Sequence, residues 1–201
     1  MAIHLALLDL VRELTSPKHL DFMALRRACG DANTLVDLLV SGVDPNSWNE
    51  QGASMLHMSD LSLDVVQLLL AAGADPDERW YGGHGRTPLF FATEYGVPTL
   101  LYHSGADLEA RDVVGLTPLL FNIQYGAVEV VEELLLLGAD DTVQDDAGLG
   151  VLDYASLVPT ETTREQLTNI FLRRHRSFVL REHLQGAALK APTVVEPPRR
   201  F

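Results

Sequence analysis

The chain has 201 residues, of which 47% are hydrophobic, so a sizeable core can be buried and a wholly disordered protein is excluded. No stretch approaches the roughly 18 consecutive apolar residues that a membrane-spanning helix requires. The single cysteine, Cys29, excludes an intramolecular disulfide and fits a reducing compartment.

The net charge of −13 is unevenly distributed along the chain. Residues 161–201 hold eight Lys/Arg and four Asp/Glu, whereas residues 1–160 hold seven Lys/Arg and 24 Asp/Glu. A body this acidic repels nucleic acid and anionic membranes, and it attracts a basic partner. The alternative interpretation is that the acidity only keeps the protein in solution. We expect neither nucleic acid nor a membrane among its partners.

The N-terminal segment, residues 1–16, is apolar but lacks the basic start and small-residue cleavage site of a signal peptide. Asp9 interrupts its apolar run. We therefore expect an N-terminal capping helix over residues 1–16 and a protein that stays in the cytoplasm.

Self-similar segments recur along the chain and predict its fold. Four segment openings align, and they are Gly52-Ala53-Ser54-Met55-Leu56-His57, Gly85-Arg86-Thr87-Pro88-Leu89-Phe90, Gly115-Leu116-Thr117-Pro118-Leu119-Leu120 and Gly148-Leu149-Gly150-Val151-Leu152-Asp153. Their aligned leucines are 33, 30 and 33 residues apart. The segment ends also align, at Ser41-Gly42-Val43-Asp44, Gly73-Ala74-Asp75, Ser104-Gly105-Ala106-Asp107 and Gly138-Ala139-Asp140.

This pattern resembles the ankyrin repeat, with its Thr-Pro-Leu-His start and Gly-Ala-Asp end at a period near 33 residues. The resemblance covers about residues 20–160 and implies an all-α solenoid of about five repeats with short hairpin loops. Residues 17–41 form a degenerate first repeat, so the ankyrin-repeat domain is expected over residues 17–160. Local chemistry agrees, because Thr can cap a helix, Pro suits its first turn, and Gly138 suits a helix end.

The C-terminal part begins with Thr162-Thr163-Arg164-Glu165, which has the spacing of a capping box. It predicts a C-terminal capping helix over residues 161–187, followed by a disordered tail over residues 188–201. The expected buried side of this helix consists of Leu167, Ile170, Phe171, Phe178 and Leu184. Its arginine cluster indicates either a phosphate or lipid contact, or a solvated face paired with acidic neighbours.

Two departures from the repeat stand out. The segment 75–84 carries a two-residue insertion with Trp80 and Tyr81 beside two glycines. The outer helix after Gly96 is three residues short, and the repeat opening at Gly52 is also shortened. Such a shortening predicts a notch on the outer face or a bend in the stack, or it is a tolerated deletion without a role.

The resemblance implies that a partner binds the concave side, on hairpin tips and inner helices. On the tips, the expected partner-binding residues are Trp48, Glu50, Asp77, Glu78, Arg79, Trp80, Tyr81, Arg111, Asp112, Asp145 and Asp146. On the inner helices, they are Glu94, Tyr95, Gln124 and Tyr125. Exposed Trp and Tyr are typical of binding hot spots. The alternatives are that the tryptophans fold back onto their hairpins, that the tyrosines pack between repeats, and that single acidic residues serve turns.

Signs of catalysis are missing from the sequence. The seven histidines form no metal-ligand pattern, and neither a Gly-x-Ser-x-Gly elbow nor a phosphate-binding loop occurs. The resemblance implies a structural role for His57, whose ring would bond backbone between repeats. We expect a protein that is not an enzyme, has no cofactor or metal, and is a monomer until it binds a basic protein.

Three functions remain open. The first is a stoichiometric inhibitor, of the immunity-protein kind, that neutralises a basic enzyme. The second is an adapter or scaffold that joins two partners. The third is a structural or regulatory subunit of a larger enzyme.

Overall fold

The computed structural model describes residues 17–188 as a two-layered, all-α repeat solenoid, which confirms the expected fold class. The expected helix over residues 1–16 and tail residues 189–201 lie outside the described residues. The inner row consists of α2 (Pro17–Ala28), the 3₁₀ turns η1 (Met55–His57) and η3 (Pro88–Phe91), α6 (Pro118–Gln124) and α8 (Val151–Leu157). The outer row consists of α3 (Ala32–Val40), α4 (Leu63–Ala71), α5 (Val97–His103), α7 (Val128–Leu137) and α9 (Glu161–Ala188).

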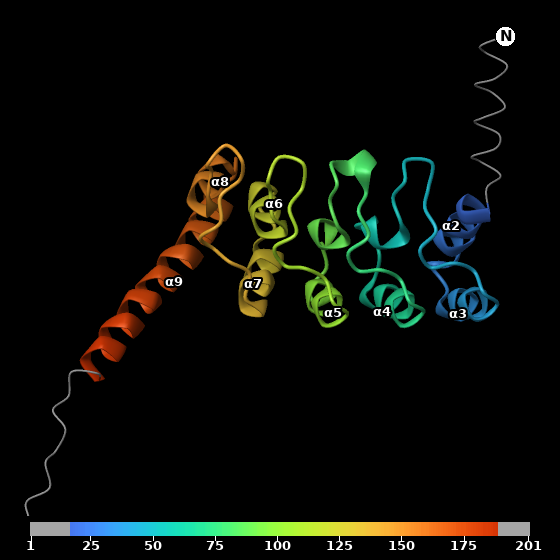
Figure 1. Cartoon of the computed structure of the whole chain (residues 1–201), viewed down its shortest axis with the longest axis horizontal. Coiled ribbons are helices and arrows are strands. Elements are labelled where there is room, and N and C mark those ends of the chain that lie inside the picture. The colour runs from blue at the N-terminus through green and yellow to red at the C-terminus, as the bar shows by residue number, and fades with distance from the viewer. Residues whose placement is uncertain (1–16, 189–201) are drawn as a thin grey trace, which may run out of the picture.

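Each element packs on its neighbour in the same row, and inner elements pack on outer ones. Figure 1 shows the two rows side by side along the long axis, with the hairpin loops projecting beyond the inner row. The core runs without a break between the rows, because the inner leucines Leu89 and Leu119 and the outer leucines Leu69, Leu101 and Leu134 are all at most 1% exposed. A single repeat could not bury these side chains alone.

The helix ends follow the chemistry of the sequence. Thr117 Oγ1 accepts a hydrogen bond from the Leu120 amide at 3.3 Å, and Pro118 occupies the first turn of α6. Helix α7, which follows α6 in the same repeat, ends at Gly138. The φ of Gly138 is 105°, a left-handed conformation that favours glycine.

The repeat with η3 and α5 has lost helix from both rows. Helix α5 has seven residues where α7 has 10, and η3 has four where α6 has seven. The prediction that Glu94 and Tyr95 lie on an inner helix is therefore wrong, since η3 ends at Phe91. Ala92 is extended, and because extended backbone covers about 3.3 Å per residue against 1.5 Å in a helix, the chain still reaches the outer row from this short inner turn.

Glu133 of α7 compensates for the lost turn. Its carboxylate is buried at 3% exposure and accepts hydrogen bonds from the amides of Gly96 at 2.8 Å and Thr99 at 2.9 Å, and from the Thr99 hydroxyl. These donors belong to the start of α5, where no side chain of the helix's own N-cap makes a hydrogen bond. The neighbouring repeat thus supplies the cap of α5.

Helix α9 buries Leu167 and Phe171, packs on α7 and α8, and pairs Arg174 with Asp141 at 2.9 Å. Its far part leaves the stack at an angle (Figure 1). The predicted burial of Phe178 and Leu184 falls where no side chains are described. Between residues 17 and 188, no helix is both long and apolar enough to span a bilayer.

We predict that Glu133→Ala lowers the free energy of unfolding by about 2–3 kcal/mol, because it leaves buried donors at the start of α5 without an acceptor. Urea titration followed by circular dichroism measures the loss. Glu132→Ala is the matched control, since this exposed neighbour on the same helix should change stability by less than about 0.5 kcal/mol. Equal effects of the two substitutions would contradict the capping role.

Candidate partner-binding surface

Successive hairpins are linked by side chains that accept a backbone amide of the next repeat. The Asp75 amide donates to Asn46 at 2.7 Å, and the Asp107 amide donates to Asp77 at 2.9 Å. One repeat later, the Asp140 amide donates to Glu109 at 2.8 Å. Asp77, expected to bind a partner, is instead half-buried and holds the next hairpin in place.

The aspartates that open each hairpin are also structural. Asp75, Asp107 and Asp140 each accept the amide two residues ahead, at 2.8–2.9 Å, which forms an Asx turn. The bond from the Thr142 hydroxyl lowers the pKa of Asp140 below its ordinary value. Much of the hairpin acidity therefore serves turns and not a partner.

Arg79 and Arg111 occupy equivalent hairpin positions and make equivalent bridges. Each guanidinium donates to a carbonyl of its own hairpin and to one of the next. Arg79 reaches the Arg111 carbonyl at 2.9 Å, and Arg111 reaches the Gln144 carbonyl at 3.1 Å. Both residues are exposed, but their donors connect adjacent hairpins.

Asp112 and Asp145 close their hairpins from within. Each carboxylate accepts two amides of its own loop at 2.8–3.0 Å. Asp112 is 7% exposed and forms an ion pair with Arg86 at 2.9 Å, so the prediction that it meets a partner at the tip is wrong. Asp145 accepts the Tyr154 hydroxyl at 2.6 Å, and burial with this bond raises the pKa of Tyr154 to about 12.

Trp80 takes the hairpin position that Asp112 and Asp145 hold in later repeats. Its indole N–H donates to the Gln51 carbonyl at 2.8 Å, and its ring lies 5.6 Å from that of Phe91. A Cβ on Gly83 would lie 2.3 Å from the indole, so the glycine lets the ring lie against the loop. Trp80 therefore folds back as the alternative interpretation proposed, and the insertion makes room for it.

Trp48 is also partly covered. The Lys18 ammonium of α2 lies 4.0 Å from the centre of a Trp48 ring, a cation–π contact, and also pairs with Asp44 at 3.6 Å. The Trp48 side chain remains 39% exposed.

His57 joins two repeats from a buried position, in the manner that the resemblance implied. Its Nδ1 accepts the Ser54 amide at 3.2 Å, and its Nε2 faces the carbonyl oxygens of Glu78 and Arg86 at 3.1 and 3.2 Å. Two carbonyls at Nε2 require a proton there, so the ring is neutral with Nε2–H as donor. Burial lowers the pKa of His57.

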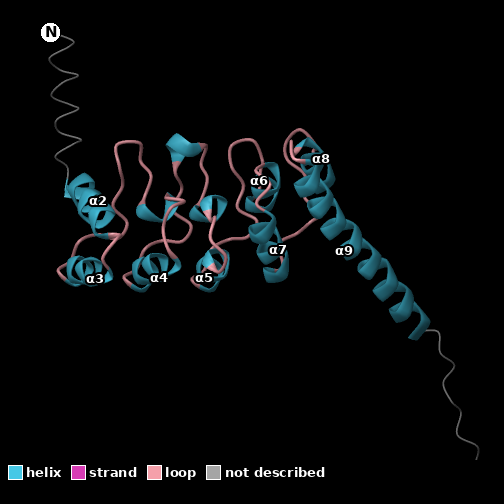
Figure 2. Ribbon diagram, turned by 180° about the vertical axis from the view of Figure 1, so that it is seen from behind, coloured by secondary structure: helices cyan, strands magenta, loops and turns pink. Residues whose placement is uncertain are grey.

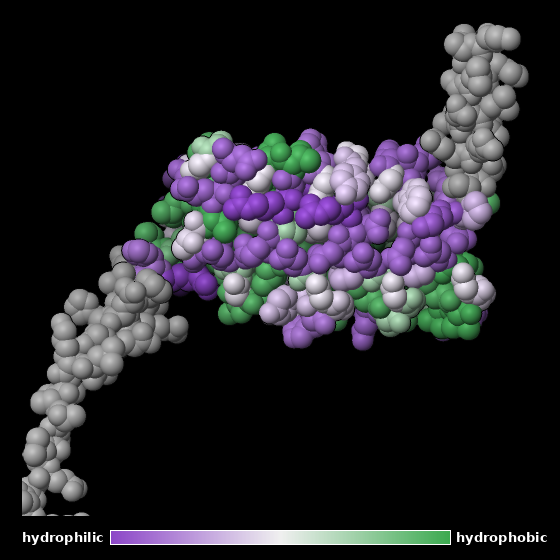
Figure 3. Space-filling view, viewed as in Figure 1, coloured by the Kyte–Doolittle hydropathy of each residue, from purple (hydrophilic) through white to green (hydrophobic). Residues whose placement is uncertain are grey.

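The most exposed apolar side chains of the hairpins form a row that we call the apolar tips: Tyr81 at 81% exposure, Val113 at 65% and Val114 at 48%. Tyr81 projects on the short turn η2 (Tyr81–Gly83), seen at a hairpin tip in Figure 2. Figure 3 shows an apolar spot on the hairpin before α6. Val113 and Val114 were not among the residues predicted from the sequence, although a Val-Val pair at a hairpin tip is a visible signal.

Backbone bonds fix the apolar tips relative to one another. The Val113 amide donates to the His84 carbonyl at 3.0 Å, and the Asp146 amide donates to the Val114 carbonyl at 3.2 Å. Three neighbouring hairpins therefore present their tips as one surface.

The other predicted site residues divide into two groups. The first group lies on the hairpins, where Glu50 and Asp146 are exposed. Glu78 belongs to this group but is half-buried, and burial raises the pKa of its carboxyl. The second group lies away from the hairpins, at or after the ends of η3 and α6. It consists of four exposed residues: Glu94, Tyr95, Gln124 and Tyr125. Tyr125 is 71% exposed and its ring lies 4.7 Å from Phe121. Within residues 17–188, no cluster of three or more His, Cys, Asp or Glu is arranged to hold a metal ion.

A family model described as ankyrin repeats, in three copies, matches residues 22–112 and 62–145. Among similar proteins, the zebrafish "Neurogenic locus notch homolog protein 1" is 31% identical over 134 residues, which cover 63% of this chain and 5% of that protein. A "Putative ankyrin repeat protein" of Rickettsia felis is 34% identical over 111 residues, 48% of each chain. The mouse "B-cell lymphoma 3 protein homolog" is 34% identical over 110 residues, 50% of this chain and 24% of that protein.

We predict that Gly83→Ala displaces Trp80 and costs roughly 1–3 kcal/mol of stability, because the new methyl overlaps the indole. In a Trp48→Phe background, the emission of Trp80 should shift to longer wavelength as its ring becomes hydrated. Gly30→Ala is the control, since its Cβ would meet nothing within 4 Å. Unchanged emission in Gly83→Ala would show that the ring does not need the glycine.

We predict that stability falls as pH drops below about 6.5, the ordinary pKa of histidine. Because the folded-state pKa of His57 is lowered, the unfolded chain binds the proton more readily, and stability is lost until the pH reaches the folded pKa. Urea unfolding at several pH values measures the slope. His57→Gln should be less stable and show a shallower slope in this window. An identical slope would assign the dependence to other groups.

Proposed function

The chain belongs to the ankyrin-repeat family, whose repeats form protein–protein interaction modules, and we propose that it is a non-catalytic, stoichiometric inhibitor of a basic protein. In this proposal the apolar tips hold the partner, and the surrounding acidic surface steers it. The partner's active or binding surface is covered by the stack.

The single observation that carries this proposal is the exposure of the apolar tips. Tyr81 and Val113 stand at the hairpin position where the other repeats carry Glu50 and Asp146, and the exposed Val114 follows Val113. Exposure of such residues has no benefit to a free protein in water, and aromatic side chains on fixed backbone are frequent energetic centres of interfaces. Their preorganisation by backbone bonds reduces the entropy lost on binding.

The charge of the stack supports a basic partner. The acidic balance of residues 1–160 favours encounter with a basic protein and makes the association rate sensitive to salt. Glu50 and Asp146 are exposed carboxylates beside the tips, in contrast to the acidic residues that serve turns.

Helix α9 favours a second candidate function, the adapter. It continues past its last described buried residue, Phe171, and its sequence there is basic while the stack is acidic. A helix that leaves the stack offers a second, chemically different surface. An inhibitor needs one partner, whereas an adapter must hold two at once.

We predict that affinity capture from the native host's lysate yields one dominant basic protein, which Tyr81→Ser/Val113→Ser no longer retains. The reason is that two of the three apolar side chains of the tips are lost while the backbone bonds of the hairpins remain. Mass spectrometry identifies the captured protein, and capture at 50 and 300 mM salt, conditions that roughly halve the screening length, should show weaker retention at the higher salt.

Val40→Ser/Leu136→Ser is the matched control, because these side chains are 82% and 79% exposed but lie on outer helices. Retention by the control and loss by the tip variant support the proposal. Retention of the same protein by both variants would exclude the tips. Capture of two proteins at once, one of them lost when α9 is cut after His175, would favour the adapter.

A further inference from the structure

Helix α2 has apolar side chains on two opposite sides. Phe22 and Leu25 face the core and are at most 4% exposed. Leu20 and Met23 lie on the other side of the helix, at 56% and 37% exposure, and their spacing of three residues makes them neighbours there. A helix with one buried stripe normally carries polar residues on its solvent side. The solvent side of α2 departs from that rule.

Helix α2 stands at one end of the inner row, and no repeat precedes it within the described residues 17–188 (Figure 1). It packs on α3 of its own repeat and on η1 of the next one. The outer surface of a terminal repeat is normally polar, because it faces water. Leu20 and Met23 therefore form an apolar surface that a further element can cover with a gain in stability.

The segment that directly precedes α2, residues 1–16, lies outside the described residues and has a suitable sequence. Ten of its 16 residues are hydrophobic, and it contains neither Gly nor Pro. Helical spacing places four large apolar residues on one side of the expected helix, and they are Ile3, Leu7, Leu10 and Leu14. Such a stripe needs an apolar surface to pack on.

Pro17 makes the chain turn between this segment and α2. It occupies the first turn of α2, and proline disfavours helical backbone in the residue before it, which is Ser16. A helix over residues 2–14 would therefore end before α2 begins. Two helices joined by so few residues pack as an antiparallel hairpin. Residues 2–14 are also about as many as the 12 residues of α2, so the two helices would match in length.

We infer that residues 2–14 bind α2 of the same chain as an antiparallel helix and cover Leu20 and Met23. The turn at Pro17 places Leu14 opposite Leu20 and Leu10 opposite Met23, because the members of each pair are about equally far from Pro17 in the sequence. Both helices then contribute apolar side chains spaced by three or four residues, which is the spacing of a helix–helix contact.

The covalent connection favours this segment over any other occupant. A segment joined to its site by a few residues has an effective concentration in the millimolar range, which a second copy of the chain does not reach at ordinary protein concentrations. The solvent side of α2 also carries the exposed Arg27, one turn after Met23. This charge would repel the basic partner proposed above, so that partner does not suit this surface.

Binding of the segment would leave the contacts of α2 with the first hairpin intact. The Lys18 ammonium lies over a Trp48 ring at 4.0 Å and pairs with Asp44 at 3.6 Å, and Asp21 accepts the Asp44 amide at 3.1 Å. Helical spacing places Lys18 and Asp21 on the side of α2 away from the apolar surface. A helix fixed from both sides would hold the first hairpin more firmly.

Hydrogen exchange followed by mass spectrometry tests the inference on the full chain. An isolated helix of this length is marginal in water, so only a bound segment should protect its amides. The amides of residues 2–14 should exchange at least about tenfold more slowly than those of an unstructured peptide. Leu20→Ser/Met23→Ser should remove this protection, whereas unchanged protection of α4 and α7 would show that the stack is still folded.

Two matched variants within the segment test which of its sides makes the contact. Leu10→Asp/Leu14→Asp changes the expected contact side and should abolish the protection of residues 2–14. Leu5→Asp/Leu8→Asp makes the same kind of substitution on the other side of the expected helix and should keep it. Neither variant changes a residue of the stack, so neither can act by unfolding it from within.

Unprotected amides in the unmodified chain would overturn the inference. Protection that survives Leu20→Ser/Met23→Ser, or that is lost equally in the two segment variants, would also overturn it. Protection that rises with protein concentration, together with a dimer mass in sedimentation, would assign the surface to a second copy of the chain instead. The apolar tips are unchanged in all of these variants, so the proposed function is tested separately.

Discussion

The structure depends on polar side chains of one repeat satisfying backbone groups of the next. Asn46, Asp77 and Glu109 accept amides of the following hairpins, and the His57 ring lies between two carbonyls of its neighbour. Glu133 does the same for an entire helix start. Around His57 and Glu133 these bonds are buried or partly buried, where an unpaired group is costly, so each of these repeats needs its neighbour for polar as well as apolar reasons.

This constraint decides which residues remain available for function. Acidic residues of the hairpins are used in Asx turns and links between repeats, and the arginines Arg79 and Arg111 are used as bridges. What is left at the tips is the set of exposed apolar side chains, with the exposed carboxylates of Glu50 and Asp146 beside them. In the proposed function the stack separates two tasks: general acidity influences encounter at a distance, while a few fixed apolar side chains supply contact.

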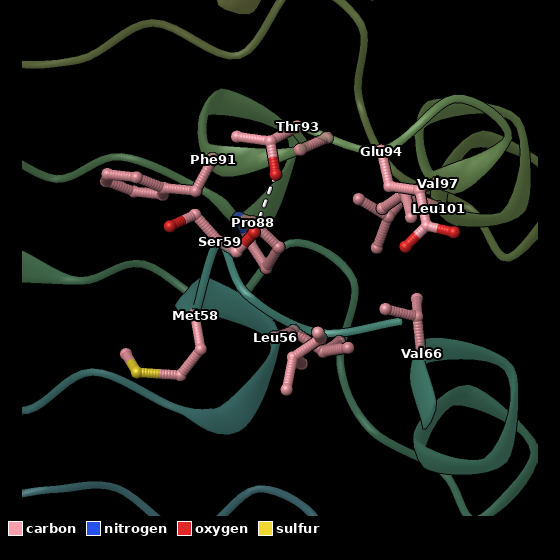
Figure 4. Close-up of a pocket in the computed structure, with 12 residues that line it drawn as sticks. Leu56, Met58, Ser59, Val66, Pro88, Phe91, Thr93, Glu94, Val97 and Leu101 are labelled. Carbon is pink, nitrogen blue, oxygen red and sulfur yellow. Dashed lines mark hydrogen bonds between the residues drawn. The ribbon is translucent and has the colours of Figure 1, made fainter. Parts of the chain in front are cut away.

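The sequence irregularities have one structural consequence each. The two-residue insertion seats Trp80 against glycine backbone and raises Tyr81 into solvent. The shortened repeats leave a small hollow between the two rows, beside Glu94 (Figure 4). In a solenoid, a local change of length is absorbed by the loops and the adjacent repeat, because contacts extend only to nearest neighbours.

The sequence by itself determined the repeat, its register and the positions where helices begin, because Thr-Pro caps, helix-ending glycines and recurring leucines act over a few residues. It also located the insertion and the shortened repeats. Only the tertiary structure decided that Asp112 is buried beside Arg86, that Trp80 folds back, and that η3 ends before Glu94. These outcomes depend on partners about 26 to 29 residues away in the chain, or on the reach required to the next helix, and no local pattern encodes such distances.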